Sequence, residues 1–110
     1  MVSTEKATQK ACLDYLGAAK IFHYRNNSGV TIAEYKGKKR LIRFGATGSP
    51  DIVAVINGRY IGFEVKDIKG KQSESQVAFQ EALERAGGAY HLIKSIDDFI
   101  NIIATYTSNK

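Results

Sequence analysis

Two carboxylates and one ammonium, those of Asp51, Glu64 and Lys66, lie on two neighbouring segments rich in β-forming residues. Asn57-Gly58 separates these segments, and Asn-Gly favours a two-residue type I′ hairpin turn, because both central residues of that turn have positive φ. In such a hairpin, position 56 faces position 59 and position 51 faces position 64. The pattern therefore predicts that Asp51 faces Glu64 across an antiparallel pair of strands.

Directly opposed side chains have Cβ atoms roughly 4.5 to 5.5 Å apart, where two like charges destabilise each other. A shared proton offsets this repulsion, but a divalent cation is the better answer, because two carboxylates suit Mg²⁺ or Mn²⁺. Strand alternation places Lys66 on the face of Glu64. Such a patch binds a metal, polarises a phosphodiester and orients an attacking water, which are the tasks of phosphodiester hydrolysis. The alternative is a surface network in which Lys66 neutralises two exposed carboxylates.

Gly62 belongs to the same face as Glu64 and has two interpretations. A missing side chain there lets a phosphate or a metal approach the backbone. Equally, the glycine marks a bulge or a weak place in the strand. The sequence does not decide between them.

Capping residues and hydrophobic periodicity predict an alternation of short helices and strands. Ser73-x-x-Gln76 matches a capping box, and Ser95-x-x-Asp98 caps a last helix. The expected helices cover about 4–19, 73–86 and 96–106, and the expected strands cover 21–25, 31–35, 41–44, 51–56, 59–66 and 90–94. This order predicts an α/β domain with a mixed β-sheet flanked by helices.

Composition limits the class of protein. The 110 residues suit one domain, 1–110, and the single cysteine and two histidines leave oxygen atoms as the expected ligands of any metal. No apolar run approaches the ~20 residues that cross a bilayer, and the N-terminus opens polar, so we expect a cytoplasmic protein without a membrane partner.

The net charge of +5 suggests a polyanionic partner. Basic residues concentrate in the segment 36–43, which holds no acid: Lys36, Lys38, Lys39, Arg40 and Arg43. A cluster of this kind suits contacts with DNA phosphates, and it equally suits a solvated loop.

A family resemblance adds to these inferences. Ser49-Pro50-Asp51 followed by Glu64-Val65-Lys66 matches the PD-(D/E)XK nuclease pattern. The sequence around this pattern resembles the virus-type replication and repair nuclease domain, VRR-NUC, of phage and bacterial stand-alone type. The matching features are Gly48 before the pattern, and Ser73-x-x-Gln76 and Ala86-Gly-Gly after it. The resemblance extends through Glu5 and the segment 25–29, and so covers most of the chain.

The resemblance implies a restriction-endonuclease-like core and a role for each matched residue. Asp51 and Glu64 would be metal ligands with the Val65 carbonyl, and Lys66 would orient the water or stabilise negative charge. Gln76 would support the site or contact the substrate phosphate. Two further residues match less specifically: Glu5 as an outer acid that equally suits the first turn of a helix, and Arg25 as a DNA contact.

The implied activity is that of a Mg²⁺-dependent, structure-selective DNA endonuclease, with Mn²⁺ able to substitute, in a bacterial host or phage-infected cell. Resolution of four-way (Holliday) junctions by a homodimer is the preferred hypothesis, because symmetric junctions present two equivalent strands. The alternatives are a flap or nicking nuclease and a catalytically silent nucleic-acid-binding module. Phe99 and Ile103 are candidates for a dimer surface, although core packing is favoured for them. Asp67 departs from the family pattern, and its role is open.

Overall fold

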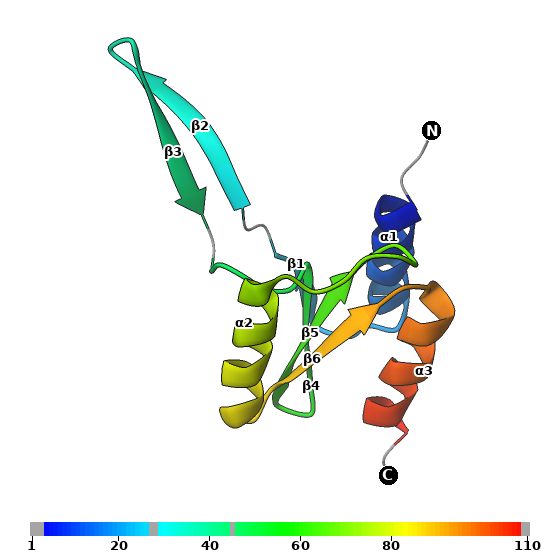
Figure 1. The fold of residues 1–110 in the computed structure, drawn as a ribbon. Helices are drawn as coiled ribbons and strands as arrows, with labels where there is room; N and C mark the ends of the chain where they lie inside the picture. Colours follow the sequence, from blue (N-terminus) through cyan, green and yellow to red (C-terminus); the bar gives the residue numbers. More distant parts are fainter. Residues whose placement is uncertain (1–3, 27–28, 45, 109–110) are drawn as a thin grey trace.

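The computed structural model describes residues 4–26, 29–44 and 46–108. Within these ranges, three helices and six strands follow one another (Figure 1). In order they are α1 (Thr4–Ala18), β1 (His23–Arg25), β2 (Gly29–Tyr35), β3 (Lys38–Phe44), β4 (Ile52–Ile56), β5 (Arg59–Val65), α2 (Glu74–Arg85), β6 (Ala89–Ile93) and α3 (Ile96–Thr107).

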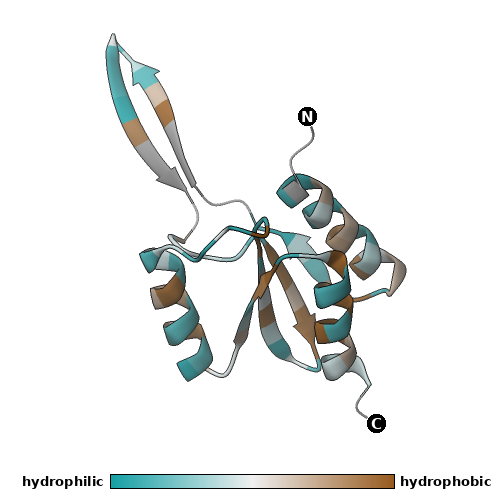
Figure 2. Cartoon of the chain, turned by 45° about the vertical axis from the view of Figure 1, so that its right-hand side comes forward, coloured by the Kyte–Doolittle hydropathy of each residue, from teal (hydrophilic) through white to brown (hydrophobic). Residues whose placement is uncertain are grey.

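Four strands form the main sheet, in the order β1-β4-β5-β6. β4 pairs antiparallel with both β1 and β5. β5 pairs parallel with β6, which follows it in the chain after α2, so the predicted mixed sheet is confirmed. Helices α1 and α3 cover one face of the sheet and α2 lies on the other (Figure 1). The most hydrophobic ribbon lies in the central strands between these layers (Figure 2).

The main core lies between the sheet and the pair α1 and α3. Phe63 of β5 meets Phe99 of α3 edge to face, with ring centroids 4.7 Å apart, and Leu16 of α1 and Ile103 of α3 complete the same cluster. Phe99 is fully buried and Ile103 is 2% exposed. Core packing, the favoured prediction for these two residues, is therefore confirmed, and neither presents a surface to a second copy.

The β4–β5 hairpin has the predicted turn and register. Asn57 and Gly58 have φ of 53° and 78°, as a type I′ turn requires, and Ile52 pairs with Phe63. One step further along, Asp51 precedes the first residue of β4, opposite the end of β5. The hairpin thus brings Asp51 to the level of Glu64.

The predicted bounds of three strands need correction. The expected strand 21–25 begins at His23, because the amide of Ile21 donates to the Leu16 carbonyl at the end of α1 and is not available to the ladder. The expected strands 31–35 and 41–44 are longer, and they form a two-stranded sheet of their own that projects from the body (Figure 1). Within the segment 25–29, which carries part of the family resemblance, residues 27 and 28 lie outside the described residues.

The capping box of α2 is present as predicted. The Ser73 hydroxyl accepts from the Gln76 amide at 3.2 Å, and the Gln76 side-chain oxygen accepts from the Ser73 amide at 2.8 Å. Gly87, with φ of 99°, ends the helix, and the Gly88 amide donates to the Leu83 carbonyl. The chain then enters β6 beside β5.

Gly62 makes room for Pro50, an explanation that neither interpretation of this glycine anticipated. A Cβ on Gly62 would lie 2.4 Å from Pro50 Cγ, well inside contact distance, and Gly62 pairs regularly with Val53 without a bulge. Pro50 immediately precedes Asp51. The missing side chain therefore lets the segment that carries Asp51 pack directly on β5.

We expect Gly62→Ala to destabilise the protein by about 2 kcal/mol, because the rigid Pro50 ring must move to admit the new methyl group. Gly17→Ala is the matched control: nothing lies within 4 Å of its added Cβ, and alanine favours a helix by up to about 1 kcal/mol. Urea unfolding would measure both. Equal stability of the two variants would contradict the packing role of Gly62.

Candidate active site

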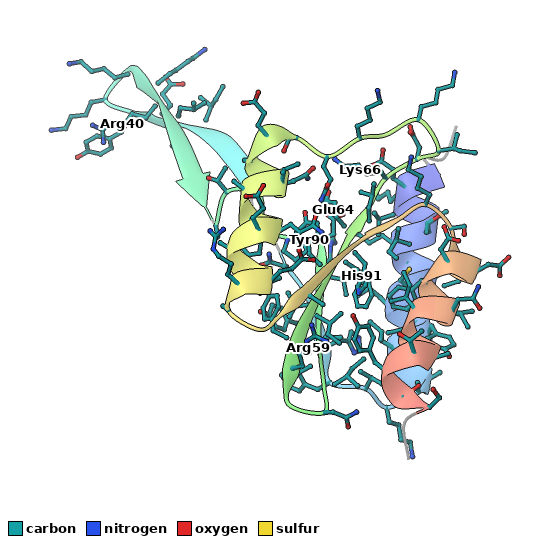
Figure 3. All side chains as sticks on the ribbon, turned by 60° about the horizontal axis from the view of Figure 1, so that its bottom comes forward. Arg40, Arg59, Glu64, Lys66, Tyr90 and His91 are labelled. Atoms are coloured by element: carbon teal, nitrogen blue, oxygen red, sulfur yellow. The ribbon has the colours of Figure 1, made fainter. Side chains whose placement is uncertain are left out.

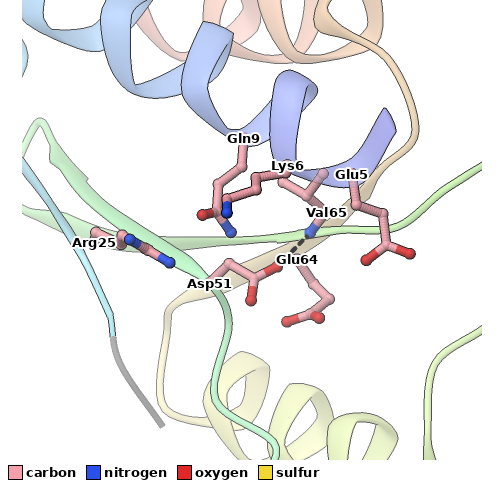
Figure 4. A pocket seen from close by; sticks show the side chains of 7 residues that line it. All are labelled: Glu5, Lys6, Gln9, Arg25, Asp51, Glu64 and Val65. Atoms are coloured by element: carbon pink, nitrogen blue, oxygen red, sulfur yellow. Dashed lines mark hydrogen bonds between the residues drawn. The ribbon is translucent and has the colours of Figure 1, made fainter. Parts of the chain in front are cut away.

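Asp51 is held at the end of the main sheet by contacts on both its side chain and its backbone. Its Oδ2 accepts a hydrogen bond from the Val65 amide at 2.8 Å, which joins it to the last residue of β5 (Figure 4). Its carbonyl accepts from the Asn26 amide, also at 2.8 Å. The carboxylate therefore has one oxygen fixed by the protein and another that is left for a ligand.

Glu64, on β5, lies beside Asp51 and is only 5% exposed. Its Oε2 is 3.5 Å from the Lys66 ammonium, which confirms that the two side chains share one face. The Lys66 amide donates to the Ile93 carbonyl of β6, and Gly70 packs against the Lys66 stem, where a Cβ would lie 2.7 Å from Lys66 Cβ. Contacts thus hold Lys66 at its backbone amide, along its side-chain carbons and at its ammonium.

Burial makes the two carboxylates difficult to ionise together. Burial and the neighbouring charge of Asp51 raise the pKa of Glu64 to about 7, although Lys66 opposes the shift. Burial likewise raises the pKa of Asp51, against the hydrogen bond from Val65. At neutral pH the pair consequently resists carrying two negative charges unless a cation balances them.

The two carboxylates open into a cavity of about 300 Å³ between the end of the sheet and the first turns of α1 (Figure 4). Acidic and basic side chains both line it: Glu5, Lys6, Gln9, Arg25, Asp51 and Glu64, together with Val65. A mixed lining of this kind accommodates a cation at the carboxylates and an anionic phosphate beside it. The structure thus brings Glu5 and Arg25 to the same cavity as Asp51 and Glu64.

The donor set fits a hard divalent cation. Asp51 and Glu64 supply carboxylate oxygens, which suit Mg²⁺ or Mn²⁺, and burial of two acids side by side leaves a charge that such an ion neutralises. Within the described residues, no three His, Cys, Asp or Glu side chains are grouped closely enough to hold a metal. Glu5 therefore lines the cavity without joining the two carboxylates as a third close acid.

The segment before Asp51 is fixed by contacts from three elements. Asn26, just after β1, donates through Nδ2 to Ser49 Oγ and to the Pro50 carbonyl, both at 2.9 Å. The Tyr90 hydroxyl of β6 donates to the Gly48 carbonyl at 3.3 Å. A Cβ on Gly48 would lie 2.1 Å from the Ser75 carbonyl, so only glycine lets the segment lie on the first turn of α2.

Gln76 lies at the start of α2, as expected, but its side-chain oxygen is occupied by the capping box. The described residues that line the cavity do not include Gln76. The structure therefore gives Gln76 a role in starting the helix on which Gly48 packs, and a contact with substrate stays a prediction.

Sequence reasoning missed four residues around the site. Lys6 and Gln9 line the cavity from α1, and Asn26 and Tyr90 hold the segment before Asp51. Gln9 is four positions after Glu5, the helical spacing that places both on one face, so this residue was accessible to pattern analysis. Asn26 and Tyr90 depend on long-range contacts and left no local signal.

Asp67, whose role was open, closes a turn. Its side chain accepts from the Lys69 amide at 3.0 Å, and its carbonyl accepts from the Gly70 amide at the same distance. This turn places Gly70 against Lys66. Asp67 therefore acts on the site through the position of Lys66.

The basic cluster occupies the β2–β3 hairpin, away from the carboxylates. Figure 3 shows Arg40 on this hairpin and Glu64 and Lys66 in the body of the protein. Lys38, Lys39 and Arg40 are exposed, as contacts with DNA require. The side chain of Arg43 lies outside the described part of the structure.

Comparison with known proteins identifies the fold. No family model matches the chain, and no curated protein matches it. A solved structure described as "VRR_NUC domain" superposes with a TM-score of 0.67 over 96% of this chain and 99% of that chain, at 20% identity. A second, described as "VRR_NUC domain protein", gives a TM-score of 0.51 at 24% identity, over 58% of this chain and 56% of that one. The chain therefore has the fold of these VRR-NUC domains, as its sequence predicted.

No helix in the described ranges is long and apolar enough to cross a membrane.

The raised pKa of Glu64 predicts a pH-dependent stability. The carboxyl ionises near 4.5 in the unfolded chain and at about 7 in the fold, so stability is lost as pH rises between these values. Asp51, Lys66 and Tyr90 are the titratable groups around it. In EDTA at pH 8, we expect the free energy of unfolding of Glu64→Gln to exceed that of the wild type by about 2 kcal/mol.

Mg²⁺ should raise the melting temperature of the wild type at pH 8 and leave Glu64→Gln nearly unchanged, because the ion balances the paired charges. Thermal unfolding with and without Mg²⁺ measures both effects. If Mg²⁺ raised the melting temperature of the two proteins equally, the ion would bind at another place.

Proposed function

We propose that this protein is a metal-dependent DNA endonuclease of the PD-(D/E)XK type. The observation that carries the proposal is the meeting of Asp51 and Glu64 at one end of the sheet, with the Lys66 ammonium 3.5 Å from Glu64. The cavity beside them also presents Lys6 and Arg25, which suit an anionic substrate. The fold shared with structures described as VRR_NUC domains supports the same activity.

In this proposal Asp51 and Glu64 would hold the cation, with the Val65 carbonyl as a further ligand and Glu5, which lines the same cavity, as an outer acid. Mg²⁺, or Mn²⁺ in its place, supplies Lewis-acid polarisation of the phosphodiester when bound. The Val65 amide would keep Asp51 oriented, because its hydrogen bond is made to Oδ2 and leaves Oδ1 for the cation.

Lys66 has the position to orient the attacking water and to stabilise the negative charge that develops on the phosphate. Its ammonium is paired with Glu64 and its side chain is largely enclosed, at 22% exposure, so its charge acts with little screening by solvent. Lys6 and Arg25, which line the cavity beside the carboxylates, would hold a non-bridging oxygen of the phosphate.

Lys66→Ala should lower the single-turnover rate of DNA cleavage by about 100-fold or more, in line with the loss of one preorganised group that stabilises transition-state charge. Lys69→Ala, which removes an exposed lysine from the adjacent turn, is the matched control and should keep nearly full activity. Full activity in both Lys66→Ala and Asp51→Ala would show that the chemistry occurs elsewhere.

For the substrate, we propose four-way junction DNA cut by a homodimer, because paired incisions across a symmetric junction need two sites. Matched four-way, flap, splayed-arm and linear substrates of one sequence, tested side by side, discriminate this from flap or nicking activity. Faster cleavage of the four-way junction is the expected result, with sedimentation of the complex showing two chains per junction. Cleavage of linear or flapped DNA at an equal rate would refute it.

A further inference from the structure

The β2–β3 hairpin stands apart from the core of the protein. It projects from the body (Figure 1), and it carries apolar side chains in water: Ile32, Tyr35 and Leu41 are 66%, 72% and 65% exposed. A lone two-stranded ribbon is at best marginally stable in water. The core does not need these side chains, so their function lies in binding.

Strand pairing divides the side chains of the hairpin between two faces. Directly paired residues share a face, so Tyr35 and Lys38 lie together with Ala33 and Arg40 on one side, which we term the Tyr35 face. These same four residues line a shallow hollow. The opposite side, the Leu41 face, carries the pairs Ile32 with Leu41 and Glu34 with Lys39.

The two faces differ in charge. Among the described side chains, the Tyr35 face has two cations, an aromatic ring and no acid, and the Lys36 ammonium lies 5.4 Å from the centre of the Tyr35 ring. On the Leu41 face, Lys39 is opposite Glu34, so its charge is locally offset. Among the described side chains of the hairpin, those of the Tyr35 face therefore combine uncompensated positive charge with an exposed ring, as nucleic-acid contacts favour.

The base of the hairpin is joined to the candidate active site. Asn26, before β2, holds Ser49 and Pro50, after β3, and its amide donates to the Asp51 carbonyl. Asn26 thus joins the chain that leads into the hairpin to the chain that leads out of it, next to Asp51. A duplex bound along the hairpin would lie beside the segment that carries Asp51.

The dimensions of the hairpin match one form of nucleic acid. Seven residues per strand extend about 20 Å, which corresponds to about six base pairs of B-form DNA. The major groove of B-form DNA, about 12 Å wide, admits a two-stranded β-ribbon, whereas the deep, narrow major groove of A-form RNA does not. The hairpin thus fits a DNA duplex better than an RNA duplex.

We propose that the Tyr35 face of the hairpin binds the major groove of a DNA duplex arm next to the cleaved phosphodiester, with Lys38 and Arg40 on the flanking phosphates. This rests on the proposed nuclease function and adds to it the form of nucleic acid and the surface that holds it. The competing occupant of the hairpin is a second copy of the chain, bound through the Leu41 face.

Lys38→Ala and Lys39→Ala form a matched test, because they remove adjacent lysines from opposite faces and change the net charge equally. Binding of a fluorescent DNA duplex would be measured by anisotropy in EDTA over a series of salt concentrations. We expect Lys38→Ala to weaken binding about 5- to 10-fold and to reduce the salt slope by about one, as the loss of one phosphate contact predicts. Lys39→Ala should stay within about twofold of the wild type.

Two further comparisons complete the experiment. An RNA duplex of the same sequence should bind the wild type and Lys38→Ala equally. Leu41→Ser should keep its DNA affinity, with sedimentation reporting the oligomeric state. Thermal unfolding should give one melting temperature for all the variants, because the side chains concerned are exposed.

Several results would overturn the proposal. Equal weakening by Lys38→Ala and Lys39→Ala would show an effect of net charge alone, and unchanged binding in both would show that the hairpin does not hold DNA. Loss of self-association and of DNA affinity in Leu41→Ser, with Lys38→Ala unaffected, would assign the hairpin to the second copy.

The binding test is independent of cleavage. EDTA removes the metal that the proposed cleavage needs, so the anisotropy series compares binding by the wild type and the lysine variants apart from the chemistry. If Lys38→Ala weakens DNA binding, Lys39→Ala does not, and no substrate is cut, only the proposed nuclease function fails. If substrates are cut and the two variants bind DNA equally well, only the inference about the hairpin fails.

Discussion

Two carboxylates that repel each other lie side by side at the end of a sheet, and the local structure is arranged to hold them there. The β4–β5 turn sets the register that makes Asp51 and Glu64 meet, and the hydrogen bond from the Val65 amide fixes one oxygen of Asp51. Burial then raises the pKa of both acids. The apo fold consequently bears a cost in stability that a cation at this position would relieve.

Close packing at two glycines and hydrogen bonds from two side chains position the segment before Asp51. Gly48 lies against the first turn of α2, and Gly62 admits the Pro50 ring, so neither position has space for a Cβ. The Tyr90 hydroxyl and the Asn26 amide group complete this support with hydrogen bonds to backbone carbonyls. Because these contacts involve backbone atoms, small movements of the segment would change the distance between the carboxylates directly.

The protein thus has two regions with different physical roles. The main sheet and its three helices bury the core and hold the carboxylates, whereas the β2–β3 hairpin exposes both of its faces to solvent. The base of the hairpin is attached through Asn26 to the segment that carries Asp51. The hairpin and the carboxylates are therefore separated in space, and the hydrogen bonds of Asn26 lie between them.

The sequence by itself determined whatever depends on neighbouring residues. Asn57-Gly58 encodes a turn, and the turn fixes the pairing that sets Asp51 opposite Glu64 and places Lys66 on the same face. The capping box of Ser73 likewise starts α2 where it was expected. Local steric preferences and side-chain periodicity suffice for these features, and for the mixed sheet flanked by helices.

Tertiary structure decided the features that join distant segments. The contact of Gly62 with Pro50, the hydrogen bonds from Asn26 and Tyr90, and the separation of the β2–β3 hairpin from the main sheet all depend on how layers pack. No local pattern encodes them, because a close approach of two backbones is specified by the whole fold. The Gln76 side-chain oxygen lies in its own helix cap, a local feature that the sequence predicted, and a contact of Gln76 with substrate stays a prediction.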